Sequence, residues 1–484
     1  MQLRPVILAI GIMTVLLAAA MLPCALIDLA DNDAQAHVFV VSGSLSGLLG
    51  GLFWVLARGG ELRMGQREAF LLTVIVWVFL PAIAAIPFIV SGHSVTDSWF
   101  ESVSAITTTG ATAFTGLDEM PRGLLLWRSI LQWIGGIGII VTAVAILPQL
   151  RVGGMQLFQL ESSDMTGKFL PRVSDVAAYI GYAYLIISAL CALLYGITGM
   201  NWFDAINHSM TTVSAGGFST YDASFGHFNG SAAIYVAIVF MTIAAMPISL
   251  FAILILQGRI MPLIRDPQPR MFVAIALLIA AIIVFYHEVH LEESAFESTW
   301  QAGVTAIFNV ISVISGTGYA SAPYDTWGDP VIALILLATF LGGCAGSASC
   351  GIKMFRLEIT GKAIFAWSQR MVQPHRKAPI RYGGRIVDED TLQSVMVFLF
   401  LYLATFMVAA ALLSFTGLDT LSAISASATS VSNVGPGLGP IVGPSGTFAP
   451  LSDTAKWICA TAMLLGRLEF VAFFVALTPR FWRG

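Results

Sequence analysis

Long apolar runs alternate along the chain with shorter, half-polar runs, and this alternation predicts the elements. A helix that crosses a membrane needs about 20 mostly apolar residues. Ten runs are expected to cross: 5–28, 37–57, 69–91, 124–149, 176–198, 231–257, 271–288, 330–341 with a continuation, 392–415 and 454–478. Four runs are too short or too polar to cross alone: 98–109, 202–214, 299–315 and 419–432. Such segments suit re-entrant helices, which are tolerated only when buried in protein or lining a wet cavity.

Composition places the chain in a membrane. Its 484 residues are 57% hydrophobic and only 11% charged, whereas a soluble domain carries roughly 25% charged residues. The first apolar run shows no cleavage site and a second run follows closely, so we expect an anchored helix rather than a removed signal. The five cysteines are scattered without metal-ligand spacing, and we interpret them as small residues of membrane helices.

Basic residues set the orientation, because Lys and Arg collect in cytoplasmic segments. With the N-terminus in the cytoplasm, the inner segments hold 20 of the 24 Lys and Arg residues. We therefore expect both termini to be cytoplasmic. The outer loops are rich in Asp and Glu, which would concentrate cations at an outer mouth. An outer loop without Lys and Arg also looks acidic for that reason alone, and both interpretations stay open.

Each of the four short runs leads into a glycine loop. The segments are "SAITTTGATAF" (104–114), "TTVSAGGFSTY" (211–221), "NVISVISGTGYASAP" (309–323) and "TSVSNVGPGLG" (429–439). Aligned on Gly110, Gly217, Gly318 and Gly435, they are separated by 107, 101 and 117 residues. Each unit reads crossing helix, short helix, glycine loop, crossing helix. Two crossings return the chain to the same side, so the pattern predicts four parallel repeats around one axis.

Four glycine loops at one level are typical of a cation pathway. A cation that crosses a membrane must exchange its water shell for other oxygens, and rings of backbone carbonyls can provide them. Glycine adopts the unusual backbone angles that such loops need at little steric cost. The hydroxyls of Thr108, Thr109, Ser315 and Thr317 could add further oxygens. The alternative for any one loop is a simple helix C-cap and turn, which the matched spacing of four loops disfavours.

These residues resemble the Trk/Ktr/HKT superfamily of potassium transporters, and most closely its bacterial TrkH/TrkG branch. The resemblance covers the whole chain, including the first helix pair. It is carried by "TTTGAT", "SAGGFST", "SGTGYAS", "SNVGPGLG", "GGCAGSASCGIK" and "LLGRLE". It implies an all-α polytopic protein with four M1–P–M2 repeats around a pseudo-fourfold pore. The expected boundaries are 1–60 for the N-terminal pair and 61–172, 173–268, 269–385 and 386–484 for the repeats.

The resemblance also implies the ion and the partners. The transported ion would be K⁺, held by filter carbonyls at Thr108, Thr109, Gly110, Ala111, Ala215, Gly216, Gly217, Phe218, Gly316, Thr317, Gly318, Tyr319, Asn433, Val434, Gly435 and Pro436. Sodium-preferring plant relatives often carry Ser at the first glycine, so Gly110 indicates potassium. A homodimer in the bacterial inner membrane and a TrkA-like cytoplasmic nucleotide-binding ring are expected, with no organic cofactor and no nucleic-acid partner. The basic segment 353–391 leaves room for contact with acidic lipid or this ring.

The eighth run predicts a gate. After residue 341 it becomes "GGCAGSASCGIKMFR", where glycine and small polar residues weaken a helix. We expect a broken helix that loops into the pore, and the resemblance implies an intramembrane gating loop here. Its predicted residues are Gly342, Gly343, Gly346, Ser347, Gly351 and Lys353. Small residues also allow close helix packing, and that alternative stays open.

Arg467 lies inside the last apolar run, where a charge is expensive and normally faces a cavity or a partner. A cation there would repel potassium and hold the gating loop through its carbonyls, a role that the resemblance also implies. The alternative is an ion pair with an acid on another span. Glu469 does not share its helix face.

Three classes of function remain. The first is a gated potassium uptake pore, and the second is an ion-coupled secondary carrier with a midplane site. We expect no buried Asp or Glu in the spans, which argues against proton coupling. The third, an intramembrane enzyme, lacks HExxH, GxSxG and clustered aspartates, so we expect no enzyme.

Overall fold

The described part of the chain is mostly helical. The computed structural model describes residues 3–59, 65–141, 173–290, 298–376, 378–383, 385–468, 470, 473–475 and 478–483. Within them the strands are β1 (Arg381–Tyr382) and β2 (Arg385–Ile386), which pair as an antiparallel hairpin. The prediction of an all-α membrane protein is confirmed. The predicted boundaries at residues 60–61 and 172 lie outside the described residues.

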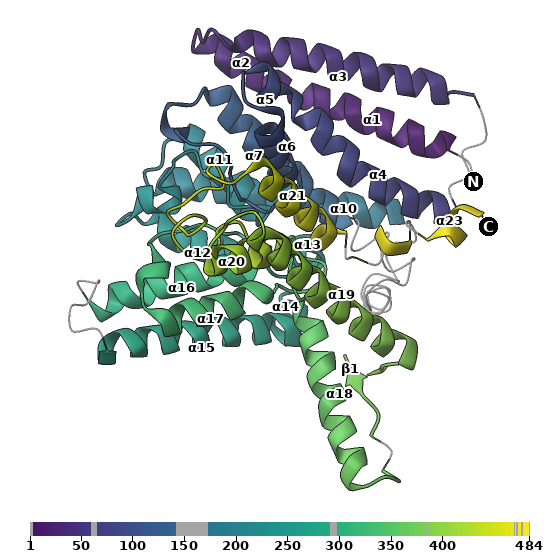
Figure 1. Cartoon of the computed structure of the whole chain (residues 1–484), viewed down its shortest axis with the longest axis vertical. Helices are drawn as coiled ribbons and strands as arrows, with labels where there is room; N and C mark the ends of the chain where they lie inside the picture. The colour runs from purple at the N-terminus through teal and green to yellow at the C-terminus, as the bar shows by residue number, and fades with distance from the viewer. Residues whose placement is uncertain are drawn as a thin grey trace.

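Three N-terminal helices form a hairpin at the top of Figure 1: α1 (Arg4–Ala20), α2 (Leu22–Ala30) and α3 (Ala36–Ala57). Helices α1 and α3 approach closely at two glycines. A Cβ on Gly11 would lie 3.0 Å from the Gly50 carbonyl oxygen, and one on Gly50 would lie 2.9 Å from the Gly11 oxygen. Small residues therefore set this helix spacing, as is usual where lipid removes the hydrophobic drive for association.

The remaining elements repeat in four groups. The first holds α4 (Gln66–Ala84), α5 (Ile86–Val90), α6 (Val95–Ile106), η1 (Leu117–Glu119) and α7 (Arg122–Val141). The second holds α10 (Val173–Ile197), α11 (Trp202–Val213), η3 (Ser224–Phe228), α12 (Ala233–Ala244), α13 (Ile248–Gln257) and α14 (Met261–Arg265). The third holds α15 (Pro267–His290), α16 (Thr299–Ser315), η4 (Tyr324–Thr326), α17 (Asp329–Phe340) and α18 (Met354–Val372). The fourth holds α19 (Glu389–Ser414), α20 (Thr420–Ser432), α21 (Asp453–Arg467) and α23 (Pro479–Arg483).

The four predicted short helices are confirmed as α6, α11, α16 and α20. All four begin in the same way, with an N-cap side-chain oxygen that accepts the backbone N–H three residues later. The N-cap residues are Ser94, Asn201, Ser298 and Asp419. A polar residue ahead of each half-polar run thus fixes where the helix starts.

Among the described residues, seven helices are long and apolar enough to cross a membrane. An eighth span would be α12 with α13, which are bent by 100° relative to one another. The run 231–257, predicted as one crossing, is therefore divided into two helices by a break at 245–247. Pro247 caps α13 and cannot continue the helix before it, which was visible in the sequence.

The break predicted after the run 330–341 is confirmed, and another predicted span, 454–478, ends early. Helix α17 stops at Phe340, and a loop over 341–353 separates it from α18, which projects from the body at the bottom of Figure 1. Helix α21 stops at Arg467, inside the run 454–478. The part of the predicted span 124–149 beyond Val141 lies outside the described residues. The short and broken helices surround the centre of the molecule, where the candidate site lies.

Candidate functional site

The four short helices end in the same backbone turn. The residues that leave them are left-handed: Thr108, Ala215, Gly316 and Asn433, with φ of 52°, 52°, 77° and 54°. Two residues later each chain is left-handed again, at Gly110, Gly217, Gly318 and Gly435, with φ of 83°, 73°, 77° and 107°. A left-handed residue with a Cβ costs roughly 1–2 kcal/mol. Such repeated strain persists only where the surrounding structure imposes it, and it clusters at functional sites.

The four loops close into a ring, which we call the filter ring (108–111, 215–218, 316–319 and 433–436). A Cβ on Gly110, Gly217 or Gly318 would overlap a carbonyl oxygen of the next loop, namely that of Gly216, Thr317 or Val434 respectively. A Cβ on Gly435 would lie 2.9 Å from the Thr109 carbonyl oxygen, which joins the last loop to the first. The fold therefore brings the four predicted segments together in chain order.

Each loop is fixed to the last turn of its own helix by a backbone hydrogen bond. The donors are Thr109, Gly216, Gly318 and Val434, and the acceptors are the carbonyls of Ser104, Thr211, Ser312 and Thr429, at 2.8, 2.9, 3.0 and 3.1 Å. The aligned helix dipoles leave partial negative charge at these C-terminal ends. The centre of the ring is therefore suited to a cation.

The predicted hydroxyl ligands differ in their surroundings. Thr109 Oγ1 lies 2.7 Å from Thr107 Oγ1 and accepts from Asn433 Nδ2 at 2.8 Å. Ser315 Oγ and Thr317 Oγ1 lie 2.8 Å apart and bond to each other. Thr108 Oγ1 is buried and has no hydrogen-bond partner among the described residues. Of the four, the Thr108 hydroxyl is the one whose hydrogen-bonding capacity is left over for an ion or water.

A cavity of about 60 Å³ lies on one side of the ring. The ring glycines Gly110, Gly217, Gly318 and Gly435 all line it. Its wall also includes parts of the loops that follow the ring, at 219–224 and 442–448. These loops lead away from the short helices, and we call the cavity the outer mouth, after the orientation predicted from the basic residues.

The predicted gating segment is a loop over 341–353 whose ends pair with each other. Gly342 N–H donates to Ile352 O and Ile352 N–H donates to Phe340 O, both at 3.0 Å. Gly346 and Gly351 are left-handed, with φ of 72° and 71°. A Cβ on Gly342 would overlap the Cys350 carbonyl oxygen. Glycine is therefore required for this fold of the loop.

The loop is bound to the break between α12 and α13. Cys344 N–H donates to Ala245 O at 2.7 Å, and Ala348 N–H donates to Ala244 O at 3.3 Å. These are carbonyls that the interrupted helix leaves without an internal donor. Gly343 sits so close that a Cβ there would lie 2.6 Å from Ala245 O. The loop after α17 thus supplies hydrogen-bond donors to the carbonyls that the break after α12 leaves free of a helical partner.

The loop also approaches the filter ring at Gly316. A Cβ on Gly316 would lie 3.5 Å from Cys350 N and 3.7 Å from Ser349 Oγ. Lys353 donates to the Ser349 carbonyl, and Ser347 Oγ donates to Cys344 O at 2.6 Å. The predicted gate residues of 342–353 therefore lie together in one loop, which comes close to the ring at Gly316.

Arg467 ends α21 beside this loop and is only 2% exposed. Its Nη1 contacts Cys350 Sγ and donates to Ala348 O at 3.4 Å. Its Nε and Nη2 have no hydrogen-bond partner, and no carboxylate pairs with it, among the described residues. Glu469 lies outside those residues. The guanidinium carbon of Arg467 lies 5.6 Å from the centroid of the Trp77 ring, so an aromatic face, and no carboxylate of the described residues, lies beside this cationic side chain.

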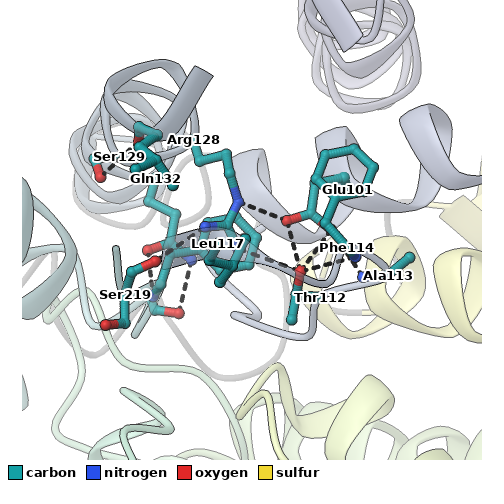
Figure 2. Close-up of polar contacts among 12 residues, drawn as sticks. Glu101, Thr112, Ala113, Phe114, Leu117, Arg128, Ser129, Gln132 and Ser219 are labelled. Carbon is teal, nitrogen blue, oxygen red and sulfur yellow. Dashed lines mark hydrogen bonds and ion pairs between the residues drawn. The ribbon is translucent and has the colours of Figure 1, made fainter. Parts of the chain in front are cut away.

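A buried ion pair beside the ring was not predicted from the sequence. Arg128 of α7 is 1% exposed and Glu101 of α6 is 0% exposed, and Arg128 Nε lies 2.7 Å from Glu101 Oε1. Figure 2 shows Arg128 between Glu101 on one side and Ser219 on the other. The positions of Arg128 in an apolar run and of Glu101 in a short helix were the available signals.

The expectation that the spans hold no buried acid is also wrong. Asp28, at the end of the predicted span 5–28, is 1% exposed. Its Oδ1 accepts the Gly123 N–H at 2.6 Å, at the start of α7. Because this carboxylate caps a helix N-terminus away from the ring, its burial has a structural cause.

Comparison with known proteins gives a consistent family. The TrkH family model, described as a cation transport protein, matches residues 35–483. The chain is 37% identical to the Trk system potassium uptake protein TrkI of Halomonas elongata, covering 99% of this chain and 97% of that protein. It is 36% identical to the Trk system potassium uptake protein TrkH of Vibrio parahaemolyticus over the full length of both. The crystal structure of the potassium transporter TrkH from that organism superposes with a TM-score of 0.91, at 34% identity, over 100% of both chains.

Proposed function

Because the chain belongs to the TrkH family of cation transport proteins, we propose that it carries potassium into the cell through the filter ring. It is a membrane transport protein and not an enzyme. The relatives named above are potassium uptake proteins. The observation that carries the proposal is the closed ring, in which each left-handed glycine faces a backbone oxygen of the neighbouring loop. Backbone carbonyls in a ring replace the water shell of a potassium ion.

The gate is formed by the loop 341–353 and Arg467. The loop contacts the inner face of the ring near Gly316, so it obstructs the path directly below the filter. Arg467 bonds to the Ala348 carbonyl and lacks a carboxylate partner among the described residues. Its charge repels a cation that leaves the ring, and its bond to Ala348 holds the loop in place. Opening requires the loop to leave both Arg467 and the α12–α13 break.

The positions of the termini and the surface of α18 bear on the orientation and the partners of the chain. Both ends of the chain lie near each other at the right of Figure 1, which supports two cytoplasmic termini in the inner membrane. Helix α18 exposes Phe365 and Trp367 beside basic residues, a surface suited to lipid or to a protein partner. The sequence has no nucleotide-binding motif, so nucleotide control would come from a separate TrkA-like ring. A homodimer completes the proposed assembly.

Uptake of radioactive rubidium into liposomes that contain the purified chain and trapped potassium tests the proposal. We expect saturable uptake that external potassium blocks and external sodium does not. Arg467→Ala tests whether a silent wild type is a closed pore. Arg370→Ala is the matched control, because Arg370 is exposed on α18 and bonds to Ala378 O at 3.3 Å. Absence of uptake in both the wild type and Arg467→Ala would contradict the proposal.

A further inference from the structure

The ion pair of Arg128 and Glu101 lies beside the filter ring, and both side chains are almost fully buried. A buried ion pair is weak support for stability, because desolvation offsets most of the attraction. The partners of the pair are therefore more informative than its existence. They lie on two neighbouring loops of the ring.

Arg128 bridges equivalent positions of the first two loops. Its Nη1 donates to Ser219 O at 3.0 Å, and its Nη2 donates to Thr112 Oγ1 at 3.3 Å. Ser219 and Thr112 each come two residues after the ring glycine of their own loop, Gly217 and Gly110. The guanidinium carbon also lies 4.1 Å from the centroid of the Phe218 ring. One side chain thus sets the spacing of two loops at the outer mouth (Figure 2).

Glu101 completes the attachment of the first loop. Its Oε1 accepts from Thr112 Oγ1 at 3.0 Å, and its Oε2 accepts the Ala113 N–H at 2.9 Å. The carboxylate therefore bonds both to the arginine and to the segment that follows Gly110. Charge-assisted hydrogen bonds of this kind are the stronger and more directional ones in proteins.

Gln132 repeats the attachment one helical turn later. Its Nε2 donates to Gly216 O at 2.7 Å, and its Oε1 accepts the Phe218 N–H at 3.1 Å. These two bonds flank Gly217. A Cβ on Gly216 would lie 2.5 Å from Gln132 Oε1, which explains why this loop carries two successive glycines.

The other two loops are held differently. Ser312 Oγ donates to Tyr319 O at 2.7 Å in the third loop, and Ser425 Oγ donates to Leu438 O at 2.8 Å beyond the fourth. Among the described residues, no charged pair takes the place of Arg128 and Glu101 there. The rigid, charge-assisted half of the ring is therefore the half formed by the first and second repeats.

We propose that Arg128, together with Glu101 and Gln132, positions the first two filter loops and thereby determines how well the ring distinguishes potassium from sodium. The inference rests on the proposed potassium pathway. Arg128 lines the outer mouth together with the four ring glycines. Substituting Arg128 therefore disturbs the positions of these glycines although the glycines themselves are not mutated. Lysine cannot replace it, because an ammonium lacks the planar fork that reaches three acceptors in fixed directions.

The test compares rubidium uptake by the wild type, Arg128→Lys and Glu101→Gln in liposomes, with sodium and potassium as competitors. We expect each variant to lower the ratio of potassium to sodium preference by about tenfold, which corresponds to ~1.4 kcal/mol. Arg122→Lys is the matched control, because Arg122 lies on the same helix and its pair with Asp31, at 3.0 Å, is exposed. This control is expected to keep the wild-type ratio.

The outcomes separate the possibilities. A wild-type ratio in Arg128→Lys, with or without a lower melting temperature, would overturn the positioning role. If Arg128→Lys does not reach the membrane, Thr112→Val is measured instead. It removes the hydroxyl that bonds to both Arg128 and Glu101 and retains the side-chain shape. An unchanged ratio of potassium to sodium preference in Thr112→Val also overturns the inference. A wild type that shows no preference for potassium would instead contradict the proposed function.

Discussion

Gly110→Ser is the most direct perturbation of the filter ring. Gly110 has a φ of 83°, and a Cβ there would overlap the carbonyl oxygen of Gly216 on the neighbouring loop. The left-handed backbone alone costs a residue with a Cβ roughly 1–2 kcal/mol. The overlap adds to this, because backbone cannot rotate away as a flexible side chain can. The second loop must therefore move, or the first must leave its present conformation.

The expected result is a loss of discrimination rather than a loss of transport. A change of ~1.4 kcal/mol in the relative binding of two ions is a tenfold change in preference. We therefore expect about tenfold lower preference for potassium over sodium, read from rubidium uptake with each ion as competitor. Serine also brings a hydroxyl oxygen into the ring, which favours the smaller and more strongly hydrated ion.

Gly92→Ser separates this effect from general backbone strain. Gly92 has a φ of 100°, and a Cβ there would meet nothing within 4 Å. It is expected to lower stability slightly and to leave ion preference unchanged. An unaltered potassium preference in Gly110→Ser, in protein that is folded and transports, would refute the assignment of this loop to the filter.

Three further predictions concern Arg467, the loop 341–353 and Asp266. Arg467→Ala is expected to raise resting rubidium flux about tenfold, equivalent to a barrier of ~1.4 kcal/mol; equal or lower flux at matched protein level would exclude a barrier. Gly343→Ala places a Cβ 2.6 Å from Ala245 O, so it is expected to loosen the loop and raise resting rubidium flux. Gly361→Ala on α18 is the control, because a Cβ there meets nothing within 4 Å, and it is expected to leave resting flux unchanged. Burial raises the pKa of Asp266 above 3.8, and nearby Glu358 adds to the shift. Proton uptake therefore favours the folded state, and stability gains as pH falls through the raised pKa towards 3.8. The melting temperature of Asp266→Asn is expected to equal or exceed that of the wild type at neutral pH, and any excess is expected to vanish in acid. A lower melting temperature of the variant at neutral pH would contradict this.

The sequence determined the local elements of the site. Hydrophobic runs located the spans and half-polar runs located the short helices. The N-cap residues Ser94 and Asp419 mark where two of these helices begin, because capping acts over three residues, although the runs alone did not give these starts. The left-handed positions at Gly110 and its counterparts were also predictable, since only glycine adopts that backbone conformation cheaply. Pro247 carried the signal for the bend between α12 and α13, although the apolar run around it favoured a continuous span.

Only the tertiary structure decided which of these elements meet. The ring closes through contacts between residues about a hundred or more positions apart, such as Gly110 with Gly216 and Gly435 with Thr109. Arg128 lies in the predicted span 124–149 without a local acidic partner, and the fold buries it against Glu101. Arg467 reaches Ala348 across 119 positions of sequence. Backbone conformation and capping depend on neighbouring residues and can be read locally, whereas the partner of a buried charge depends on which distant segments the packing of the repeats brings beside it.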